Sequence, residues 1–372
     1  MEFDLRSHTI LLTLAGSRAY GLHTEESDVD VKGVCIPPAI YLTGCFKRFD
    51  QADKPSHMEP FTSLLSPDLR AAVEHEKLEG TVYAIQKFMK LASDANPNIL
   101  DVLFCRDSEV LFQTDAGKTL RENREMFISK KAFYTFRGYA KSQLSRILTH
   151  RAWLLSPVET KPQRADFGLS EDKRSLRTYR ESKSAIRKRM DQWAWDFGDL
   201  PDSEIIRLKS VLSDTVADMV TSDSDEWARA GRSLGMTDEL LEKLQAERAY
   251  DQAMQNWKQY QDWKRRRNPK RAAMEAESGY DRKHAMHLVR LYRTGAELLS
   301  TGKVNIWRED RDELLAVRNG AYSYDEMMSL VKKEDDTLQE LVRTNVCVVP
   351  NKPDREKIEQ LCSRLVLQSL SV

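Results

Sequence analysis

The sequence predicts an α+β fold, in which an N-terminal domain of strands and helices (residues 1–126) precedes a large helical region (residues 127–372). Two observations support this division. Short β-branched apolar runs and alternating polar–apolar patterns fade after about residue 127, where helical periodicity rich in Arg, Gln, Glu and Ala dominates. A length of 372 residues is also sufficient for two domains.

Two strands are predicted near the N-terminus. Residues 8–14 (HTILLTL) form a short apolar run that is typical of a buried strand. Residues 28–36 (DVDVKGVCI) alternate polar and apolar side chains, which indicates a second strand with one covered face. Residues 42–70 show no clear pattern, and we expect them to form a long loop over a functional site.

Three helices have clear sequence signals. Residues 81–92 place apolar side chains at helical spacing, and Asn96-Pro97 ends that segment. Ser323 and Glu326 have the spacing of a capping box, in which each side chain binds a free backbone amide of the first turn. Lys352-Pro-Asp precedes a last predicted helix over residues 355–370.

The composition excludes several classes of protein. Hydrophobic residues make up 41% of the chain, too many for wholesale disorder, and no apolar run approaches the ~20 residues of a membrane span. The charged N-terminus (MEFDLRSH) has no apolar segment, so no secretory signal is expected. Five widely spaced cysteines without a CxxC pair argue against a disulfide framework or structural zinc and predict a cytoplasmic protein.

Charge is balanced overall but segregated along the chain. The 58 basic residues equal the 58 acidic ones, which gives no global reason to bind nucleic acid. Residues 130–190 nevertheless contain 16 Lys or Arg against 5 Asp or Glu, and residues 191–260 contain 7 against 15. The basic segment could hold a phosphate backbone, or it could form solvated helix faces that pair with the acidic segment.

The residues with the clearest chemistry are Gly16, Ser17, Asp28 and Asp30. Gly16 and Ser17 end the first predicted strand, and the two aspartates lie on the second. Residues two apart on a strand share a face, so both carboxylates are expected to project together beside the Gly-Ser turn. Such like charges repel unless a cation lies between them, and hard oxygen ligands suit Mg²⁺ or Mn²⁺. The alternative is a surface turn followed by a solvent-facing strand edge.

This arrangement predicts a site for a metal-bound nucleoside triphosphate. The glycine allows close approach of the backbone, and the Ser17 hydroxyl and nearby amides could hold phosphate oxygens. A two-metal nucleotidyl transfer site normally needs a third carboxylate, for which Glu79 is the first choice and Glu74 and Glu76 are the alternatives. Lys32 lies on the same strand face as the aspartates and could either hold a phosphate or neutralise them.

Two segments, GSRAYG at 16–21 and SDVDVKG at 27–33, resemble the nucleotidyltransferase domain of the DNA polymerase beta superfamily. The resemblance is greatest to the branch linked to RNA repair (RlaP type), and further similar segments occur at 87–88, 96–104, 138–140, 283–291 and 299–303. It implies a mixed sheet in the N-terminal domain. It also implies nucleotide binding by Gly16 and Ser17 and metal binding by Asp28 and Asp30.

The resemblance extends to a later segment, KHAMHLVRL at 283–291. On a helix, Lys283, His287 and Arg290 would present an imidazole and two cations to a triphosphate or an RNA end. We therefore include these three residues among the predicted nucleotide-binding residues. A packed amphipathic helix is the alternative interpretation.

The resemblance implies a metal-dependent nucleotidyltransferase that moves a nucleoside monophosphate from an NTP, such as ATP, to an acceptor hydroxyl. An RNA terminus, of tRNA-like structure, is the first expected acceptor, with residues 127–372 as the acceptor-binding region. A protein acceptor, as in toxin–antitoxin AMP- or UMP-transferases, agrees better with the zero net charge. A nucleotide-binding module without catalysis is a third hypothesis.

Overall fold

A computed structural model of the chain describes residues 3–24, 27–73, 78–171, 177, 181, 184, 237–267 and 269–370. The chain divides into two compact units. Unit 1 consists of Met1–Arg146 and Arg282–Val372, and unit 2 of Ile147–Asp281. The boundary at 126/127 was predicted from the change in sequence texture, which is a different criterion, and it stays a prediction.

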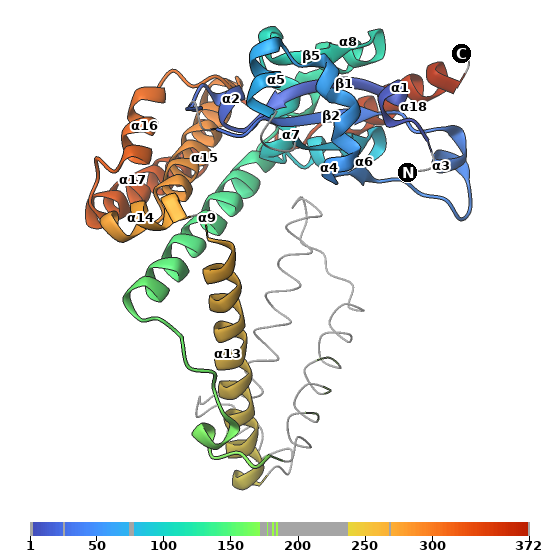
Figure 1. The fold of residues 1–372 in the computed structure, drawn as a ribbon. Coiled ribbons are helices and arrows are strands. Elements are labelled where there is room, and N and C mark those ends of the chain that lie inside the picture. The colour runs from blue at the N-terminus through green and yellow to red at the C-terminus, as the bar shows by residue number, and fades with distance from the viewer. Residues whose placement is uncertain are drawn as a thin grey trace. The chain divides into compact units, whose positions relative to one another are not determined.

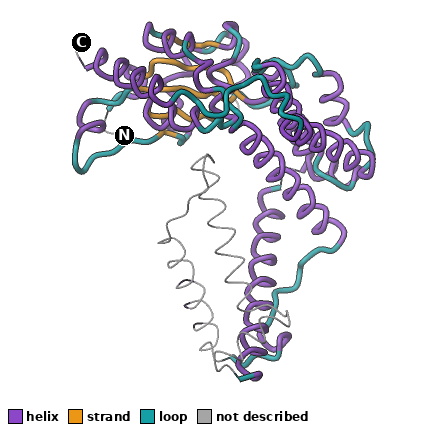
Figure 2. Tube along the Cα trace, turned by 180° about the vertical axis from the view of Figure 1, so that it is seen from behind, coloured by secondary structure: helices purple, strands orange, loops and turns teal. Residues whose placement is uncertain are grey.

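Unit 1 is built around a five-stranded mixed sheet in the order β3-β4-β2-β1-β5 (Figures 1 and 2). The central pair, β1 and β2, is antiparallel, β2 and β4 are parallel, and β3 and β5 are antiparallel edge strands. Helices follow the sheet in the chain, and no strand follows β5 among the described residues, so the α+β prediction is confirmed. The strands are β1 (Thr9–Ala15), β2 (Asp30–Cys35), β3 (Gln51–Ala52), β4 (Glu79–Ala84) and β5 (Val110–Gln113).

Both faces of the sheet are covered, which explains the continuous apolar run of β1. On one face, Met58 and Phe61 pack in a buried cluster with Leu12, Val31 and Val82 of the central strands. On the other face, α6 (Ile85–Ser93) contacts β2, and α7 (Pro97–Phe104) contacts β1. A strand that is buried on both faces has no need of polar residues at alternate positions.

Three sequence predictions change in detail. The predicted helix over 81–92 is wrong in its first turn, because residues 81–84 belong to β4 and the helix begins at Ile85. The predicted loop over 42–70 is also wrong, since it contains β3, α4 (Pro55–Met58) and other short helices. The strand predicted over 28–36 begins at Asp30, so Asp28 lies just before β2. Because Thr81 and Val82 are β-branched, they suit the strand that tertiary pairing imposes.

A bundle around α15 (Arg282–Thr301) completes unit 1, with α16 (Arg311–Asn319) and α17 (Tyr324–Arg343) packed against it (Figure 1). The capping box at Ser323 and Glu326 is confirmed, and so is the last helix, α18 (Arg355–Leu370). The remaining helices that begin in unit 1 are α1 (Leu5–His8), α2 (Gly16–Tyr20), α3 (Ala39–Thr43), η1 (Glu59–Leu64), α5 (Pro67–Val73), η2 (Asp107–Glu109), α8 (Asp115–Glu122), η3 (Arg124–Phe127) and α9 (Lys131–Leu155).

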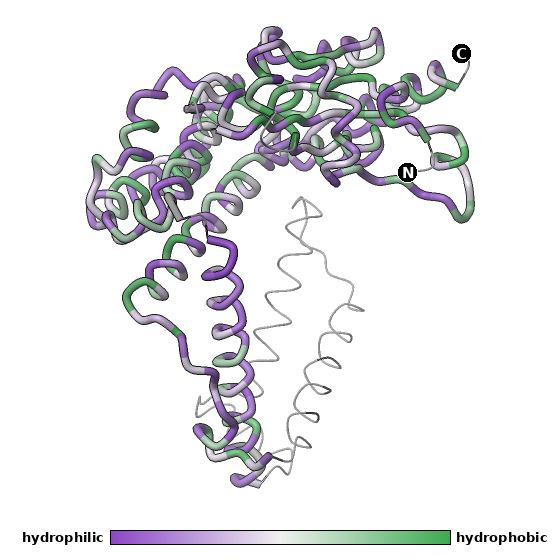
Figure 3. The backbone as a smooth tube through the Cα atoms, viewed as in Figure 1, coloured by the Kyte–Doolittle hydropathy of each residue, from purple (hydrophilic) through white to green (hydrophobic). Residues whose placement is uncertain are grey.

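Unit 2 is helical in its described part and contains the largely hydrophilic helix α13 (Figure 3). A buried ion pair joins Arg164 to Glu247, with side chains 3% and 0% exposed. Trp153 and Trp263 pack with their ring centroids 5.4 Å apart. Most of the predicted acidic segment, residues 191–236, lies outside the described residues. The helices are η4 (Arg164–Phe167), α13 (Asp238–Arg266) and α14 (Pro269–Ser278).

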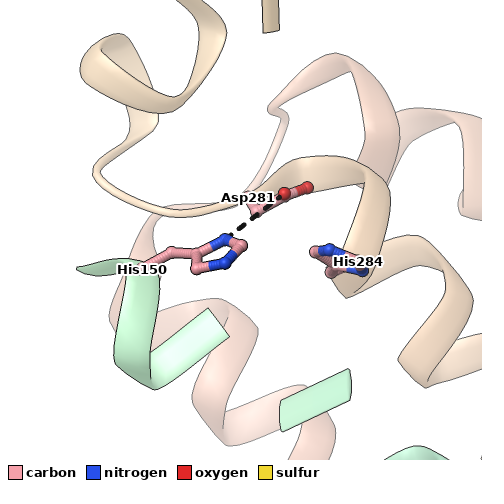
Figure 4. A group of neighbouring side chains, drawn as sticks. All are labelled: His150, Asp281 and His284. Carbon is pink, nitrogen blue, oxygen red and sulfur yellow. Dashed lines mark ion pairs between the residues drawn. The ribbon is translucent and has the colours of Figure 1, made fainter. Parts of the chain in front are cut away.

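A second polar contact within unit 2 brings His150 close to Asp281 (Figure 4). The Nδ1 atom of His150 lies 3.9 Å from a carboxylate oxygen of Asp281, whose side chain is 1% exposed. This separation is too long for a hydrogen bond.

Within the described ranges, no helix is both long enough and apolar enough to cross a membrane.

The start of α9 is attached to the sheet domain by a buried ion pair. The Nζ atom of Lys131 lies 3.3 Å from Oδ1 of Asp94, and the two side chains are 4% and 7% exposed. One turn later, the Thr135 hydroxyl donates to the carbonyl of Ala95 at 2.8 Å. These contacts set the direction of α9, which carries part of the cavity wall described below.

We expect Asp94→Asn to lower the free energy of unfolding by about 3 kcal/mol, because it leaves the Lys131 ammonium buried without its counter-charge. The matched control is Glu122→Gln, which breaks an exposed pair with Lys118 whose side chains are 62% and 64% exposed. This control should cost about 0.5 kcal/mol or less. Urea unfolding followed by circular dichroism measures both, and equal losses would contradict the structural role of the buried pair.

Candidate active site

A cavity of about 710 Å³ in unit 1 opens between the sheet and the helices α7, α9 and α15. The volume falls within the range of small-molecule sites. Six of the nine predicted site residues line it, namely Gly16, Asp30, Lys32, Glu79, His287 and Arg290. The other lining residues are Ala15, Tyr20, Val31, Asp53, Pro55, Gly80, Thr81, Pro97, Asn98, Tyr139, Ser142, Gln143, Arg146 and Leu291.

The strand register brings Gly16, Asp30 and Glu79 into one row. Asp30 is paired with Ala15 of β1 on one side and with Glu79 of β4 on the other. Directly paired residues of neighbouring strands point to the same face, so the two carboxylates are neighbours across the β2–β4 pair. Glu79 was expected just before a helix, but it is the first residue of a strand.

The position of Gly16 beside Asp30 leaves no room for a side chain. Its φ of +61° lies in the left-handed region, and a Cβ at this position would collide with Oδ2 of Asp30. Only a glycine therefore lets the backbone after β1 approach the Asp30 carboxylate this closely. Ser17 follows as the second residue of α2 and is not among the residues that line the cavity.

Asp28 lies just before β2, and its negative charge acts on the carboxylate of Asp30. Arg18 holds the preceding loop, since its side chain donates to the carbonyls of Ser27 at 3.0 Å and Asp28 at 3.3 Å. Burial raises the pKa of Asp30, and the negative charge of Asp28 raises it further, whereas Lys32 and Lys283 oppose the shift. A partly buried carboxylate with a second carboxylate close by suits a divalent cation between them.

Lys32 is held at the floor of the cavity. Its Nζ atom donates to Oδ1 of Asn98, at the start of α7, over 3.1 Å. Burial lowers the pKa of Lys32, while the negative charges of Asp101 and Asp30 oppose that shift. Lys32 thus has carboxylates near it without a direct ion pair among the described residues, and its ammonium could also meet a phosphate.

Arg290 is a buried cation in the opposite wall. It is 6% exposed, and its Nε atom has no hydrogen-bond partner among the described residues. The guanidinium stacks on the ring of Tyr20, with its Cζ atom 3.7 Å from the ring centroid. Tyr20 in turn donates its hydroxyl proton to the buried carboxylate of Asp101. This geometry holds Arg290 at the cavity, with a buried Nε that has no hydrogen-bond partner among the described residues.

His287 and Lys283 lie one helical turn apart on α15, but only His287 lines the cavity. Burial lowers the pKa of His287 well below its usual range, and the positive charges of Arg290 and Lys283 lower it further. The imidazole is therefore neutral near pH 7 and offers a hydrogen bond rather than a charge. Lys283 acts at longer range, through its effect on the pKa of Asp30.

The sequence analysis did not identify several residues that lie in or beside the cavity. Asp53 follows the short edge strand β3, and Tyr20 and Asp101 support Arg290. The polar residues of α9 at positions 139, 142, 143 and 146 have the spacing of one helix face, a signal that could have been noticed. The alternative third carboxylates, Glu74 and Glu76, lie outside the described residues.

Comparison with known proteins places the N-terminal part of the chain. Residues 3–161 match the family model described as RlaP, RNA repair pathway DNA polymerase beta family. A 142-residue segment is 31% identical to an uncharacterized 38.9 kDa protein in the nrdC-mobD intergenic region of Enterobacteria phage T4, and it spans 37% of this chain and 38% of that protein. No solved structure matches the chain significantly. Residues 3–161 are therefore similar to the RNA repair pathway DNA polymerase beta family, a family of nucleotidyltransferases.

Proposed function

We propose that this chain is a divalent-metal-dependent nucleotidyltransferase that moves a nucleoside monophosphate from an NTP to a hydroxyl at an RNA terminus. The supporting observation is that Gly16 directly after β1, Asp30 on β2 and Glu79 on β4 lie side by side and line one cavity with Lys32 and Arg290. Carboxylates and a lysine on the sheet, with an arginine on α15, match a metal-bound triphosphate. The similarity of residues 3–161 to a family of nucleotidyltransferases supports the same class of reaction.

The carboxylates are assigned to the metal and the acceptor. Asp28, Asp30 and Glu79 would hold Mg²⁺ or Mn²⁺, as their oxygen donors suit these ions. A bound ion would supply charge neutralisation and Lewis acidity at the transferred phosphoryl group. The acceptor oxygen forms a bond to the α-phosphorus, the bond to pyrophosphate breaks, and Glu79 is placed to accept the hydroxyl proton.

The cations are assigned to the triphosphate. Arg290 offers its Nε–H from a buried position, and the neutral imidazole of His287 can donate or accept one hydrogen bond. Lys32 would hold a phosphate oxygen, and Lys283 would act through its charge from the same helix as Arg290. The expected contact between Ser17 and the triphosphate requires its hydroxyl to turn towards the cavity.

The RNA acceptor is supported by two observations. The family description names an RNA repair pathway, and residues 130–190 carry an excess of basic side chains. Basic side chains of this kind would contact phosphates without reading sequence. Transfer to a protein hydroxyl is the competing outcome, and the zero net charge of the chain favours it.

The carboxylate assignment predicts the outcome of a labelling assay. The wild type, incubated with each α-³²P-labelled NTP, Mg²⁺ or Mn²⁺ and total RNA, should label RNA. Asp30→Asn and Glu79→Gln should each reduce labelling by about 10²-fold or more, the usual effect of losing one transition-state electrostatic contact. Asp53→Asn, which alters another carboxylate of the same cavity, should retain most activity.

The outcomes of this assay separate the three functions. Loss of activity in Asp53→Asn but not in Glu79→Gln would reassign the third carboxylate. Label in a protein band instead of RNA would favour the protein acceptor. If the wild type bound NTP but transferred nothing, the chain would be a binding module.

A second prediction concerns Gly16. In Gly16→Ala the added methyl group would displace the Asp30 carboxylate, and we expect transfer to fall by about 10²-fold, as for other small misplacements of a catalytic group. The matched control is Gly168→Ala, at a φ of +68° with no atom within 4 Å of the added Cβ. Both variants carry the same type of backbone strain. Equal transfer rates in the two would contradict the close approach.

The RNA acceptor predicts a steep dependence on salt. Counterion release should weaken RNA binding by about 10-fold or more between 50 and 200 mM salt. Filter binding of the RNA identified by labelling measures this dependence. A flat response would argue against contacts with the RNA backbone and for a neutral protein acceptor.

A further inference from the structure

The wall of the cavity formed by α9 carries mainly neutral polar side chains, whereas the sheet and α15 carry charged ones. Tyr139, Ser142, Gln143 and Arg146 line the cavity from one face of α9. Of these four, only Arg146 at the far end is charged. The face from 139 to 146 extends about 10 Å along the helix axis. A ligand that spans the cavity would therefore meet charge at the sheet and α15 and neutral groups at α9.

Tyr139 presents a fixed aromatic ring. Its hydroxyl accepts a hydrogen bond from Nδ2 of Asn96 at 2.8 Å. Asn96 is itself fixed as the N-cap of α7, where its Oδ1 accepts from the amide of Asn98 at 3.0 Å. The other lining tyrosine, Tyr20, has its ring covered by Arg290. Among the described residues, no ring or cation stacks on Tyr139, which is half-buried and lines the cavity.

Gln143 provides a directed donor one turn further along the same face. Its Oε1 lies 2.7 Å from Nδ1 of His284. A carboxamide oxygen can only accept, so Nδ1 of His284 carries the proton in this contact. The Nε2 group of Gln143 then has two N–H donors, and no partner for them occurs within the described ranges. A planar ligand stacked on Tyr139 could accept from this group at its edge.

We propose that the Tyr139–Gln143 face of α9 is the nucleobase subsite of the nucleotidyltransferase. This inference rests on the proposed function, which assigns the charged walls to the metal and the triphosphate. A nucleobase is flat, neutral and bordered by hydrogen-bond acceptors, which matches an aromatic ring followed by an amide donor. The same chemistry does not suit the triphosphate, which carries negative charge and needs cations.

The test compares the binding of NTPs with the binding of inorganic tripolyphosphate, which lacks the nucleoside. Calorimetry measures the binding of ATP, GTP, CTP and UTP, and of inorganic tripolyphosphate, all with Mg²⁺. Tyr139→Leu should weaken the best-bound NTP by about 10-fold, the effect expected for the loss of one base–aromatic stack. Its affinity for tripolyphosphate should be unchanged. Gln143→Leu should weaken the NTP and not tripolyphosphate.

Two control variants accompany the test. Tyr139→Phe keeps the ring and should retain most of the NTP affinity. Tyr134→Leu changes another tyrosine of α9, which is 42% exposed and does not line the cavity, and it should alter neither probe. Circular dichroism verifies that each variant is folded. A second measurement does not depend on variants: 8-azido-ATP or 4-thio-UTP should cross-link the wild type within residues 138–146.

Each result decides between the alternatives. Equal weakening of NTP and tripolyphosphate by Tyr139→Leu, or no effect on either, would overturn the nucleobase subsite. Cross-linking at Asp53 or Thr81 would place the base on the sheet wall and would also overturn it, even if Tyr139→Leu failed to fold. If the wild type bound no triphosphate at all, the proposed function itself would fail, and the subsite with it.

Discussion

The pairing of β2 with β1 and β4 is the constraint on which the candidate site depends. β1 is antiparallel to β2, so its C-terminal end meets the beginning of β2, while β4 is parallel to β2 and begins beside it. Gly16, Asp30 and Glu79 consequently meet at one edge of the sheet. A slip of one residue in either pair would turn a carboxylate to the opposite face. Such a slip is opposed because it would remove the side chains of Leu12, Val31 and Val82 from the buried cluster that they form with Met58 and Phe61.

The charged side chains that line the cavity are not fully compensated by opposite charges among the described residues. Burial and the charge of Asp28 raise the pKa of Asp30, and neither the half-buried Lys32 nor the buried Arg290 has a direct ion pair among the described residues. Burial of charge is unfavourable unless it is compensated. Asp101 provides part of the compensation through its charge near Lys32 and its hydrogen bond from Tyr20. A divalent cation and a polyanion together would satisfy both walls.

The cavity combines segments that are far apart in the chain. Asp30 and Glu79 come from the sheet, whereas Arg290 and His287 come from α15, more than 200 residues later. The α15 wall is held in place by the packing of α16 and α17, and Arg308 after α15 donates its amide to the carbonyl of Tyr20 at 3.1 Å. The matched family segment, residues 3–161, includes the sheet and α9 but not α15. The wall that carries Arg290 and His287 therefore depends on the part of unit 1 that lies outside the matched segment.

The sequence alone was sufficient for the α+β class, the first strand, the capping box at Ser323 and the last helix, because each depends on local periodicity or local hydrogen bonding. It also indicated the family through the segments around Gly16 and Asp30. Tertiary structure decided that residues 81–84 form a strand, because pairing with β2 outweighs an apolar spacing that also fits a helix. It likewise placed Glu79 beside Asp30 and Tyr139 in the wall of the cavity. Such contacts between distant segments are set by strand register and helix packing, which local sequence patterns do not determine.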